Sequence, residues 1–496
     1  MLHYRASKLS GDPFTGGSMI LVRLFNEKLA QTSWLIGDDE TRQAVVVDPN
    51  RDPASYMAAA QKEDVRIVAV TETHIHADFV SGSRELAKRA GAKLYLSDMG
   101  EAPWKYAFAE SDGAVLLSEG DVIEVGSIRL HAVHTPGHTP EHLSFVVIDT
   151  SVSKVPIGLL TGDFIFAGDV GRPDLLEKSA GVSGGAQEGA RALFASMQKL
   201  KGCPDYAQLW PGHGSGSACG KGINAMPQTT LGYERATSHA FGYRNEDAFI
   251  AGVLEGQTDP PPYFAHMKNV NRAGPETLSG RERAARVSVK QIAEIVSKGG
   301  LVVDTRPTAD FANEHIPGTI NIPFNKAFLG WVGWLVPVDA DICLIIDARK
   351  GGGIDEAVRD LAMIGMERVT AWTGHTVIDT WKSDGRAVEQ TPQMSVEELR
   401  AKIADGSVHV VDVRNPGEWQ DGHIPGVKNV PLGVIGGRAG EIPNEKPVVV
   451  HCQGGTRSSI AASVLQARGV KDVINLTGGF GAYTKAGGEI ERGGEK

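Results

Sequence analysis

The sequence predicts an α/β protein built from several domains, and three observations support this fold class. The chain has 496 residues, more than one hydrophobic core usually organises, so two to four domains are expected. Apolar runs of strand length alternate with helix-like stretches, which is typical of α/β folds. The second half contains an internal repeat with an offset of 108 residues, in which Asp304 corresponds to Asp412. We expect three domains, at residues 19–275, 286–386 and 392–492.

The composition is that of an ordinary globular protein, with 41% hydrophobic and 22% charged residues. The net charge of −10 gives no indication of a nucleic-acid partner, and no apolar run is long enough to span a membrane. The polar stretch 1–18 lacks the core of a secretory signal, and we expect the first strand to begin at Met19. Four scattered cysteines without a CxxC pair suit a reducing cytoplasm. We expect a cytoplasmic homo-oligomer with neither nucleic acid nor membrane as a partner.

The first group of polar residues, Thr73–Phe79, follows a predicted buried strand at 65–70. Its potential metal ligands are His74, His76 and Asp78. A helix-like segment follows at 83–89, so the group lies on a loop at the carboxyl end of a strand, where chemistry is often found. A lone histidine would most simply decorate a turn, whereas the H-x-H-x-D spacing favours a metal site.

Three more predicted strands, at 128–133, 157–160 and 207–210, lead to a histidine or an aspartate. The residues that follow them are His138, Asp163 and His213. A further strand-like run that starts at Ala44 ends in Asp48 and Pro49. Because metal ligands normally converge from several loops, the histidines and aspartates that follow these strands predict a metal centre.

The motifs THIHAD, HTPGHT, TGD and PGHG together resemble those of the metallo-β-lactamase superfamily, over nearly all of residues 19–275. The resemblance implies an αββα sandwich with metal at one edge of its paired sheets. Many members of the superfamily are dinuclear zinc hydrolases with a histidine directly after the aspartate of the first motif. This chain has Phe79 there, and a phenyl ring cannot bind a metal, so a single metal is favoured.

Within the superfamily, the chain is most similar to the persulfide dioxygenases. This resemblance implies one Fe(II) per chain, bound by His74, His138 and Asp163, which is the two-histidine, one-carboxylate set of non-haem iron enzymes that bind O₂. It further implies a low-molecular-weight thiol persulfide as substrate and sulfite as product. The remaining motif residues would orient the ligands and hold water; they are His76, Asp78 and His213. Zinc is the alternative metal, as in thioester hydrolases of the glyoxalase II type.

Two residues near the metal motifs have open roles. Arg172 either binds a carboxylate or phosphate of the carrier thiol or forms a structural salt bridge with Asp169 or Asp174. Cys219 lies six residues after His213 on a glycine-rich loop. Its thiol either exchanges with the substrate persulfide or is a small buried apolar group.

The second copy of the repeat contains a strand, Val448–Val450, that leads through His451 to a loop beginning at Cys452 and closing at Arg457. Successive backbone N–H groups in such a loop bind an anion, and the following helix adds its dipole. Both stabilise a negatively charged sulfur on Cys452. The residues between the two ends form the predicted sulfur-binding loop: Gln453, Gly454, Gly455 and Thr456.

Both copies resemble rhodanese sulfurtransferase domains, through the D-x-R, H-I-P-G and cysteine-loop motifs taken together. The resemblance implies two α/β domains with central parallel sheets. Cysteine phosphatases share this fold, but their loop is one residue longer and binds phosphate, whereas six residues from Cys452 to Arg457 suit sulfur. We expect structural roles for Asp412, Arg414 and His423.

The first copy of the repeat has no nucleophile. Aligning the apolar strand at 344–347 with the strand that precedes Cys452 places Ala348 opposite that cysteine. This copy is interpreted as degenerate, with dimerisation or presentation of the other copy as its function.

The fusion suggests an enzyme of sulfide detoxification. The dioxygenase releases sulfite, and the rhodanese moves sulfane sulfur between thiols and sulfite, forming or using thiosulfate. The alternatives are a dinuclear zinc thioester hydrolase and a sulfur-relay scaffold. The carrier thiol, whether glutathione, coenzyme A or another, and the direction of sulfur transfer stay open.

Overall fold

The computed structural model describes residues 3–4, 19–179, 181–278, 283–350 and 352–493. Two compact units make up the chain. The first unit comprises Met1–Arg281 with Ala362–Gly365, and the second comprises Glu282–Leu361 with Met366–Lys496. The three-domain boundaries stay a prediction, and the stretch 5–18 lies outside the described residues.

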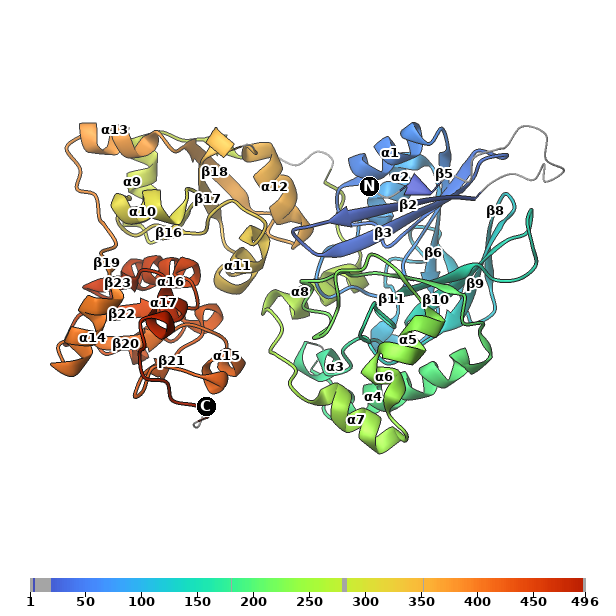
Figure 1. The fold of residues 1–496 in the computed structure, drawn as a ribbon. Helices are drawn as coiled ribbons and strands as arrows, with labels where there is room; N and C mark the ends of the chain where they lie inside the picture. The colour runs from blue at the N-terminus through green and yellow to red at the C-terminus, as the bar shows by residue number, and fades with distance from the viewer. Residues whose placement is uncertain (1–2, 5–18, 180, 279–282, 351, 494–496) are drawn as a thin grey trace. The chain divides into compact units, whose positions relative to one another are not determined.

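The first unit contains a seven-stranded sheet whose strands follow one another in chain order (Figure 1). The first strands pair antiparallel as far as β4, and β4 to β7 pair parallel. As predicted, β2 begins at Met19. The strands are β1 (His3–Tyr4), β2 (Met19–Asn26), β3 (Gln31–Asp38), β4 (Gln43–Val47), β5 (Arg66–Thr71), β6 (Lys93–Ser97) and β7 (Val115–Leu117).

A second sheet of the first unit has six strands in the order β13-β12-β11-β10-β9-β8. Its strands pair antiparallel, except that β11 and β12 are parallel. The strands are β8 (Val122–Val125), β9 (Ile128–His134), β10 (Leu143–Asp149), β11 (Gly158–Gly162), β12 (Gln208–Pro211) and β13 (Thr229–Thr230).

Three buried apolar clusters show that the first unit has four layers. Trp34 and Phe145 belong to the cluster that joins the inner faces of the two sheets. Tyr56 and Leu86, on the first two helices, pack on the outer face of the seven-stranded sheet. Leu193 and Phe249 do the same for the six-stranded sheet. This helix–sheet–sheet–helix order confirms the predicted αββα sandwich, because each sheet buries one face on the other and one under helices.

Two helices of the first unit, α4 and α8, have more than ten residues. The helices of this unit are α1 (Pro53–Lys62), α2 (Ser83–Ala90), η1 (Ala102–Trp104), α3 (Leu175–Lys178), α4 (Gly185–Lys199), η2 (Leu200–Gly202), α5 (Leu231–Thr237), α6 (His239–Gly242), α7 (Glu246–Leu254) and α8 (Tyr263–Ala273). Among the described residues of the whole chain, no helix combines the length and apolar character needed to cross a lipid bilayer.

The second unit contains two five-stranded sheets of the same topology. Their orders are β14-β18-β17-β15-β16 and β19-β23-β22-β20-β21, and every pairing is parallel, as predicted. The first sheet has β14 (Ala285–Arg286), β15 (Leu301–Asp304), β16 (Ile320–Asn321), β17 (Ile342–Ile346) and β18 (Val369–Gly374). The second has β19 (Gln393–Met394), β20 (His409–Asp412), β21 (Lys428–Asn429), β22 (Val448–His451) and β23 (Val473–Leu476).

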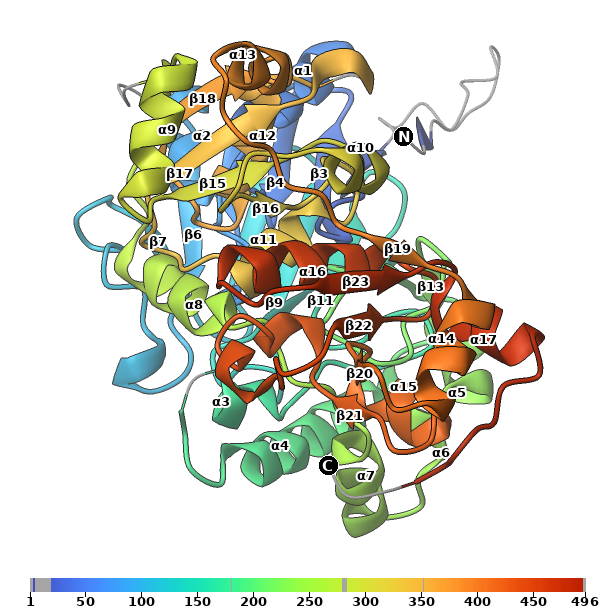
Figure 2. The same ribbon diagram turned by 90° about the vertical axis from the view of Figure 1, so that its left-hand side faces the viewer.

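Helices accompany both parallel sheets of the second unit. The first copy has α9 (Val289–Ser297), α10 (Thr308–Asn313), α11 (Phe328–Leu335), η3 (Ala348–Lys350), α12 (Ile354–Met363) and α13 (Val377–Ser383). The second has α14 (Val396–Ala404), α15 (Pro416–Asp421), η4 (Leu432–Val434), η5 (Ala439–Glu441), α16 (Thr456–Ala467) and α17 (Gly479–Lys485). Helix α16 also contacts β16 of the first copy (Figure 2), where the Asn321 N–H donates to Ser463 Oγ at 2.9 Å.

The internal repeat extends to individual side-chain contacts. Buried Asp412 binds Arg414 at 2.6 Å, and buried Asp304 binds Arg306 at 2.7 Å in the other copy. His423 stacks on the Trp419 ring with centroids 3.7 Å apart, and its counterpart stacks in the same way on a phenylalanine. The described contacts of Asp412, Arg414 and His423 are thus internal to the fold, in agreement with the structural roles expected for them.

The strand register corrects the alignment of the two cysteine-loop positions. Val411 pairs with Val450 in the second copy, and the equivalent residue Val303 pairs with Leu344. Following both strands onward, the counterpart of Cys452 is Ile346 rather than Ala348. The alignment by apolar pattern failed because the apolar run of β17 continues two residues beyond the position equivalent to Val450, so matching the ends of the two runs shifted the strands by two residues. Residues 346–353 contain no cysteine, so the copy still lacks a nucleophile.

Candidate metal centre and sulfur-transfer loop

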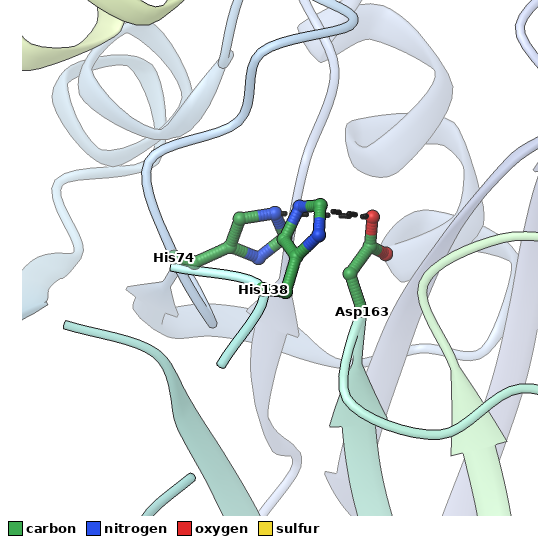
Figure 3. A group of neighbouring side chains, drawn as sticks. All are labelled: His74, His138 and Asp163. Atoms are coloured by element: carbon green, nitrogen blue, oxygen red, sulfur yellow. Dashed lines mark ion pairs between the residues drawn. The ribbon is translucent and has the colours of Figure 1, made fainter. Parts of the chain in front are cut away.

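The predicted metal ligands meet at the carboxyl ends of three strands. His74 follows β5, His138 follows β9 and Asp163 follows β11. Figure 3 shows both imidazole rings and the carboxylate turned toward one another. One ligand atom from each lies within 4.8 Å of the others, and all three side chains are buried.

These three side chains have free metal-binding atoms. The Nε2 atoms of His74 and His138 lie 3.9 Å and 3.6 Å from Asp163 Oδ2. Buried His74 Nε2 and Asp163 Oδ2 have no hydrogen-bond partner. Because unpaired buried polar atoms are costly, a cation shared by these atoms would satisfy them. The donor set of two imidazoles and one carboxylate therefore fits a divalent transition metal.

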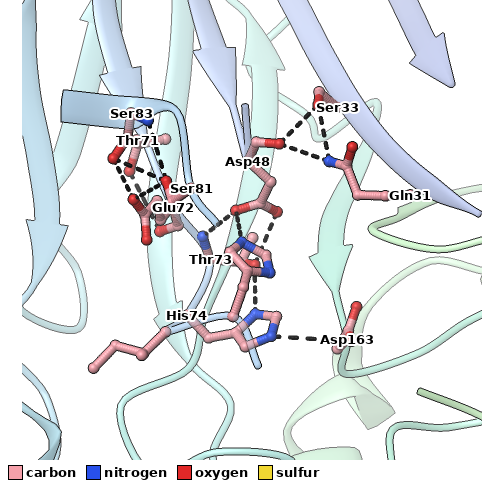
Figure 4. A network of polar contacts seen from close by, with 12 residues as sticks. Gln31, Ser33, Asp48, Thr71, Glu72, Thr73, His74, Ser81, Ser83 and Asp163 are labelled. Carbon is pink, nitrogen blue, oxygen red and sulfur yellow. Dashed lines mark hydrogen bonds and ion pairs between the residues drawn. The ribbon is translucent and has the colours of Figure 1, made fainter. Parts of the chain in front are cut away.

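The tautomer of His74 is fixed by a neighbouring hydroxyl (Figure 4). Thr73 Oγ1 donates to Asp48 Oδ2 at 2.9 Å and, with its lone pair, accepts from His74 Nδ1 at 2.9 Å. The proton on Nδ1 leaves the Nε2 lone pair free for a metal. Asp48 and Thr73 were not predicted as site residues, although Asp48 ends an apolar strand and Thr73 begins the first motif.

His76 faces Asp48 rather than the cluster. Its Nε2 lies 3.1 Å from Asp48 Oδ1. Burial opposes the charged form of His76, but the Asp48 carboxylate raises the pKa of its ring to about 9. Buried Phe79 packs beside it, with ring centroids 4.3 Å apart. His76 thus helps to fix Asp48, which in turn binds Thr73, the residue next to His74. The orienting role of His76 in a metal site stays a prediction.

Buried Glu72, which comes directly before the first motif, binds residues that follow the motif and so links the two ends of this loop (Figure 4). Both Ser81 and Ser83 donate their hydroxyls to this carboxylate, and Tyr106 donates to it at 3.1 Å. Burial raises the pKa of Glu72. Glu141 anchors the middle of the loop by accepting the Ile75 N–H at 2.8 Å. These contacts restrict the segment that carries His74.

His138 is oriented by a main-chain acceptor. Its Nδ1 lies 3.1 Å from the Arg172 carbonyl oxygen, which can only accept, so the proton is on Nδ1 and Nε2 faces Asp163. Burial lowers the pKa of His138, and burial followed by the neighbouring histidines lowers that of His74. Both rings are therefore neutral, the form that binds metals.

His213 lies between two carboxylates. Its Nδ1 is 2.7 Å from Asp163 Oδ1 and its Nε2 is 2.8 Å from Asp78 Oδ2. Burial opposes the charge on His213, but these carboxylates raise its pKa well above the usual value. Burial would raise the pKa of Asp163, yet His213 lowers it below the usual value. His213 thus joins Asp78 to Asp163 and fixes the orientation of the Asp163 carboxylate. The roles predicted for these residues in a metal site stay predictions.

Gly171 permits a close approach that shapes the ligand group. A Cβ atom at this position would lie 1.8 Å from the Asp163 carbonyl oxygen and 3.1 Å from His138 Cβ.

His142, another residue that was not predicted, accepts the Asp163 N–H through Nε2 at 3.2 Å. It lies four residues after His138, and that spacing was the available signal.

The structure places Arg172 and Cys219 beside the metal centre. Buried Arg172 binds Asp174 at 2.7 Å and donates to the Ala218 and Thr258 carbonyls, which is the salt-bridge alternative. The Cys219 thiol is buried in a second ligand group with Asp78 and His213. Burial, then the nearby carboxylates, raises its pKa well above the usual value. Substrate roles for both residues stay predictions.

The predicted sulfur-transfer loop connects β22 to α16. Its nucleophile, buried Cys452, accepts from the Gly455 N–H at 3.1 Å and lies 3.5 Å from Ser458 Oγ, a neighbour that was not predicted. Gly455 has φ +99°, a backbone conformation that glycine adopts readily, and it precedes the first residue of α16. The Cys452 carbonyl accepts from the Phe480 N–H at 2.7 Å, which ties the loop to α17. One backbone N–H and one hydroxyl are thus the neutral donors beside the sulfur, and Arg457 also interacts with it.

Arg457, in the first turn of α16, is paired with a residue that sequence reasoning missed. Its two Nη atoms donate to the Glu418 carboxylate at 2.6 Å and 2.7 Å. Hydrogen bonding to Glu418 raises the pKa of Arg457. Partial burial opposes ionisation of Glu418, but Arg457 lowers its pKa. The catalytic roles of Cys452 and Arg457 stay predictions.

Comparison with known proteins agrees with this architecture. The metallo-beta-lactamase superfamily model matches residues 27–213, and a rhodanese-like domain model matches residues 395–486. The crystal structure of a metallo-beta-lactamase from Staphylococcus aureus subsp. aureus COL is 37% identical, with a TM-score of 0.64, and the match covers 72% of this chain and 99% of that one.

The curated relatives include persulfide dioxygenases and hydroxyacylglutathione hydrolases. Persulfide dioxygenase ETHE1, mitochondrial, of Bos taurus is 28% identical over 219 residues, covering 43% of this chain and 75% of the relative. A hydroxyacylglutathione hydrolase of Rhodopseudomonas palustris is 30% identical over 181 residues, covering 36% and 61%. The chain therefore belongs to the metallo-β-lactamase superfamily and carries a rhodanese-like domain in its C-terminal part.

Proposed function

We propose that this protein oxidises the persulfide of a low-molecular-weight thiol to sulfite in an iron-dependent reaction, and that Cys452 transfers sulfane sulfur on the same chain. The observation that carries the proposal is the cluster of His74, His138 and Asp163, with three ligand atoms facing one point. Two imidazoles and one carboxylate form the ligand set of non-haem Fe(II) oxygenases, which leaves positions for O₂ and substrate. The likeness to persulfide dioxygenases supports it.

The overall reaction balances as RSSH + O₂ + H₂O → RSH + SO₃²⁻ + 2 H⁺. Bound Fe(II) would supply the O₂ chemistry. The protein contributes the fixed tautomers of His74 and His138, the ionised Asp163, and a buried site where bulk water is restricted. The His213–Asp78 pair keeps Asp163 oriented during turnover.

Sulfur transfer proceeds in two balanced steps at Cys452. Its thiolate takes the outer sulfur of a persulfide, so that Cys452-S⁻ and RSSH give Cys452-SS⁻ and RSH. Sulfite then removes that sulfur as thiosulfate and regenerates the thiolate. The Gly455 N–H and the Ser458 hydroxyl are placed to stabilise the sulfur anion in both forms. Sulfite from the first unit would thus be the acceptor for the second, which is a function in sulfide detoxification.

A zinc thioester hydrolase is the second candidate, because Asp78, His213 and Cys219 form another potential ligand group and hydrolases of this kind are among the relatives. We expect about one iron per chain, as one facial triad requires. Glutathione persulfide and coenzyme A persulfide should be compared as substrates by O₂ electrode, and S-lactoylglutathione should be tested for hydrolysis. Two zinc ions per chain with thioester hydrolysis would refute the proposal.

Two variants separate the proposed activities. His138→Ala should lose metal and O₂ uptake while keeping sulfur transfer, because only the first unit loses a ligand. Cys452→Ser should lose sulfur transfer and keep O₂ uptake. A scaffold without oxygen chemistry predicts no O₂ uptake in any variant, including the unchanged protein.

A further inference from the structure

The Cys452 loop contains one formal cation, Arg457, and that charge is neutralised in the structure by a fixed partner. Both terminal nitrogens of the guanidinium donate to Glu418, in the two-point geometry that is strongest for this pair. Glu418 is itself held in α15, where its carboxylate accepts the Asn415 N–H at 3.2 Å in a capping box. The pair is therefore an anchored contact between two helices.

In the degenerate copy of the repeat, the residue equivalent to Glu418 also binds an arginine. The counterpart of Glu418 is Asp310 in α10, and its carboxylate accepts from Arg349 at 2.6 Å. That arginine belongs to the segment between β17 and α12, which corresponds to the Cys452 loop. Asp347 also binds this arginine, through Nε and Nη2 at 2.7 Å each, so Asp310 is one of two carboxylates on the loop cation of the degenerate copy.

Two neutral donors, a backbone N–H and a hydroxyl, lie beside Cys452 Sγ. Arg457 also interacts with this sulfur, while both of its Nη atoms are held by Glu418, so the guanidinium is shared between the carboxylate and the single charge of a thiolate or bound persulfide. A doubly charged anion such as phosphate or thiosulfate would gain much more from a free guanidinium, which binds such groups at two points. Glu418 competes with these anions for the same nitrogens.

We propose that Glu418 is a specificity-determining positioning residue of the Cys452 loop: by holding Arg457, it weakens binding of fully doubly charged anions such as thiosulfate and favours sulfur donors whose charges are remote from the reacting sulfur. Sulfite, the proposed acceptor, still holds its second proton in part at neutral pH and is affected less, and weaker binding of thiosulfate helps its release as a product. This inference rests on the proposed sulfur transfer at Cys452. It assigns a charge-setting function to a residue that touches neither the nucleophile nor the metal centre.

The test compares Glu418→Gln with the unchanged full-length protein. We expect the inhibition constant of inorganic phosphate and the KM for thiosulfate each to fall about fivefold, equivalent to about 1 kcal/mol of binding. The KM for glutathione persulfide should change less than about twofold, since its charges are remote from the sulfur. Glu418→Asp, which copies the arrangement of Asp310, should restore the original ratio of the two KM values.

Asp310→Asn is the matched control, because it removes the equivalent contact in the copy of the repeat that has no nucleophile. It should leave the inhibition constant of phosphate and the KM values for thiosulfate and glutathione persulfide unchanged. The proposal is overturned if Glu418→Gln leaves phosphate inhibition and the KM ratio unchanged, or if Asp310→Asn shifts them equally. Glu418→Ala is the second variant should the glutamine form fail to fold. Calorimetric titration with phosphate needs no turnover, so it tests the inference even if sulfur transfer proves absent.

Discussion

Replacing Thr73 with valine should weaken metal binding without removing a ligand. Valine has nearly the shape of threonine but lacks the hydroxyl that joins Asp48 to His74, with both contacts at 2.9 Å. His74 then loses the acceptor that keeps its proton on Nδ1. Loss of such an orienting contact typically lowers metal affinity about 10- to 100-fold, or about 1.4–2.7 kcal/mol.

Thr305→Val provides the matched control. Thr305 is buried in the second unit, where its Oγ1 donates to the Ile345 carbonyl oxygen at 2.9 Å, so the substitution does not touch the ligand group of the first unit. Both substitutions leave buried polar atoms without a partner, so each should lower the free energy of unfolding by about 1–3 kcal/mol. Only Thr73→Val should also lower the affinity for iron.

Anaerobic competition with a chromogenic chelator would give the metal affinities, and denaturant unfolding of the metal-free proteins would give the stabilities. Equal metal affinity in the two variants would refute the reasoning, because Thr73 would then contribute only to folding. Equal loss of stability with a selective loss of metal affinity is the expected result.

Three further predictions follow from particular contacts. Gly171→Ala should lower the metal content of the protein, because the added Cβ would clash with the Asp163 carbonyl. Gly202→Ala is the control and should leave the metal content unchanged, because the space around Gly202 is open. Elemental analysis measures the metal content of both variants. Removing the metal should lower the melting temperature, because a ligand at 100 times its Kd stabilises the folded protein by about 2.7 kcal/mol. In the His138→Ala variant, calorimetry should show a melting temperature that no longer depends on the metal. Asp412→Asn and Asp304→Asn should each cost about 3–5 kcal/mol in denaturant unfolding, since each leaves a buried arginine uncompensated; unchanged unfolding would show that these pairs add nothing to stability.

Much of the fold could be predicted from the sequence because its patterns are local. Apolar runs that end in polar motifs located β5, β9, β11 and β12, and the 108-residue repeat gave two similar parallel sheets. The grouping of His74, His138 and Asp163 came from resemblance, and the structure brings their ligand atoms within 4.8 Å. The alignment at Ala348 was wrong because the apolar run of β17 is longer than that of β22, and only the pairing with the neighbouring strand fixes the register.

The sequence by itself determined which residue types are available: four separate motifs with potential metal ligands, a phenylalanine at position 79, and one cysteine loop with a closing arginine. Only the tertiary structure decided what each nitrogen and oxygen faces. His74 and His76 are equivalent in the motif, yet one points an unpaired Nε2 at Asp163 and the other binds Asp48. Arg457 likewise proved to be paired with Glu418. These partners come from distant segments, so hydrogen-bond geometry after folding, rather than spacing along the chain, sets tautomer and charge.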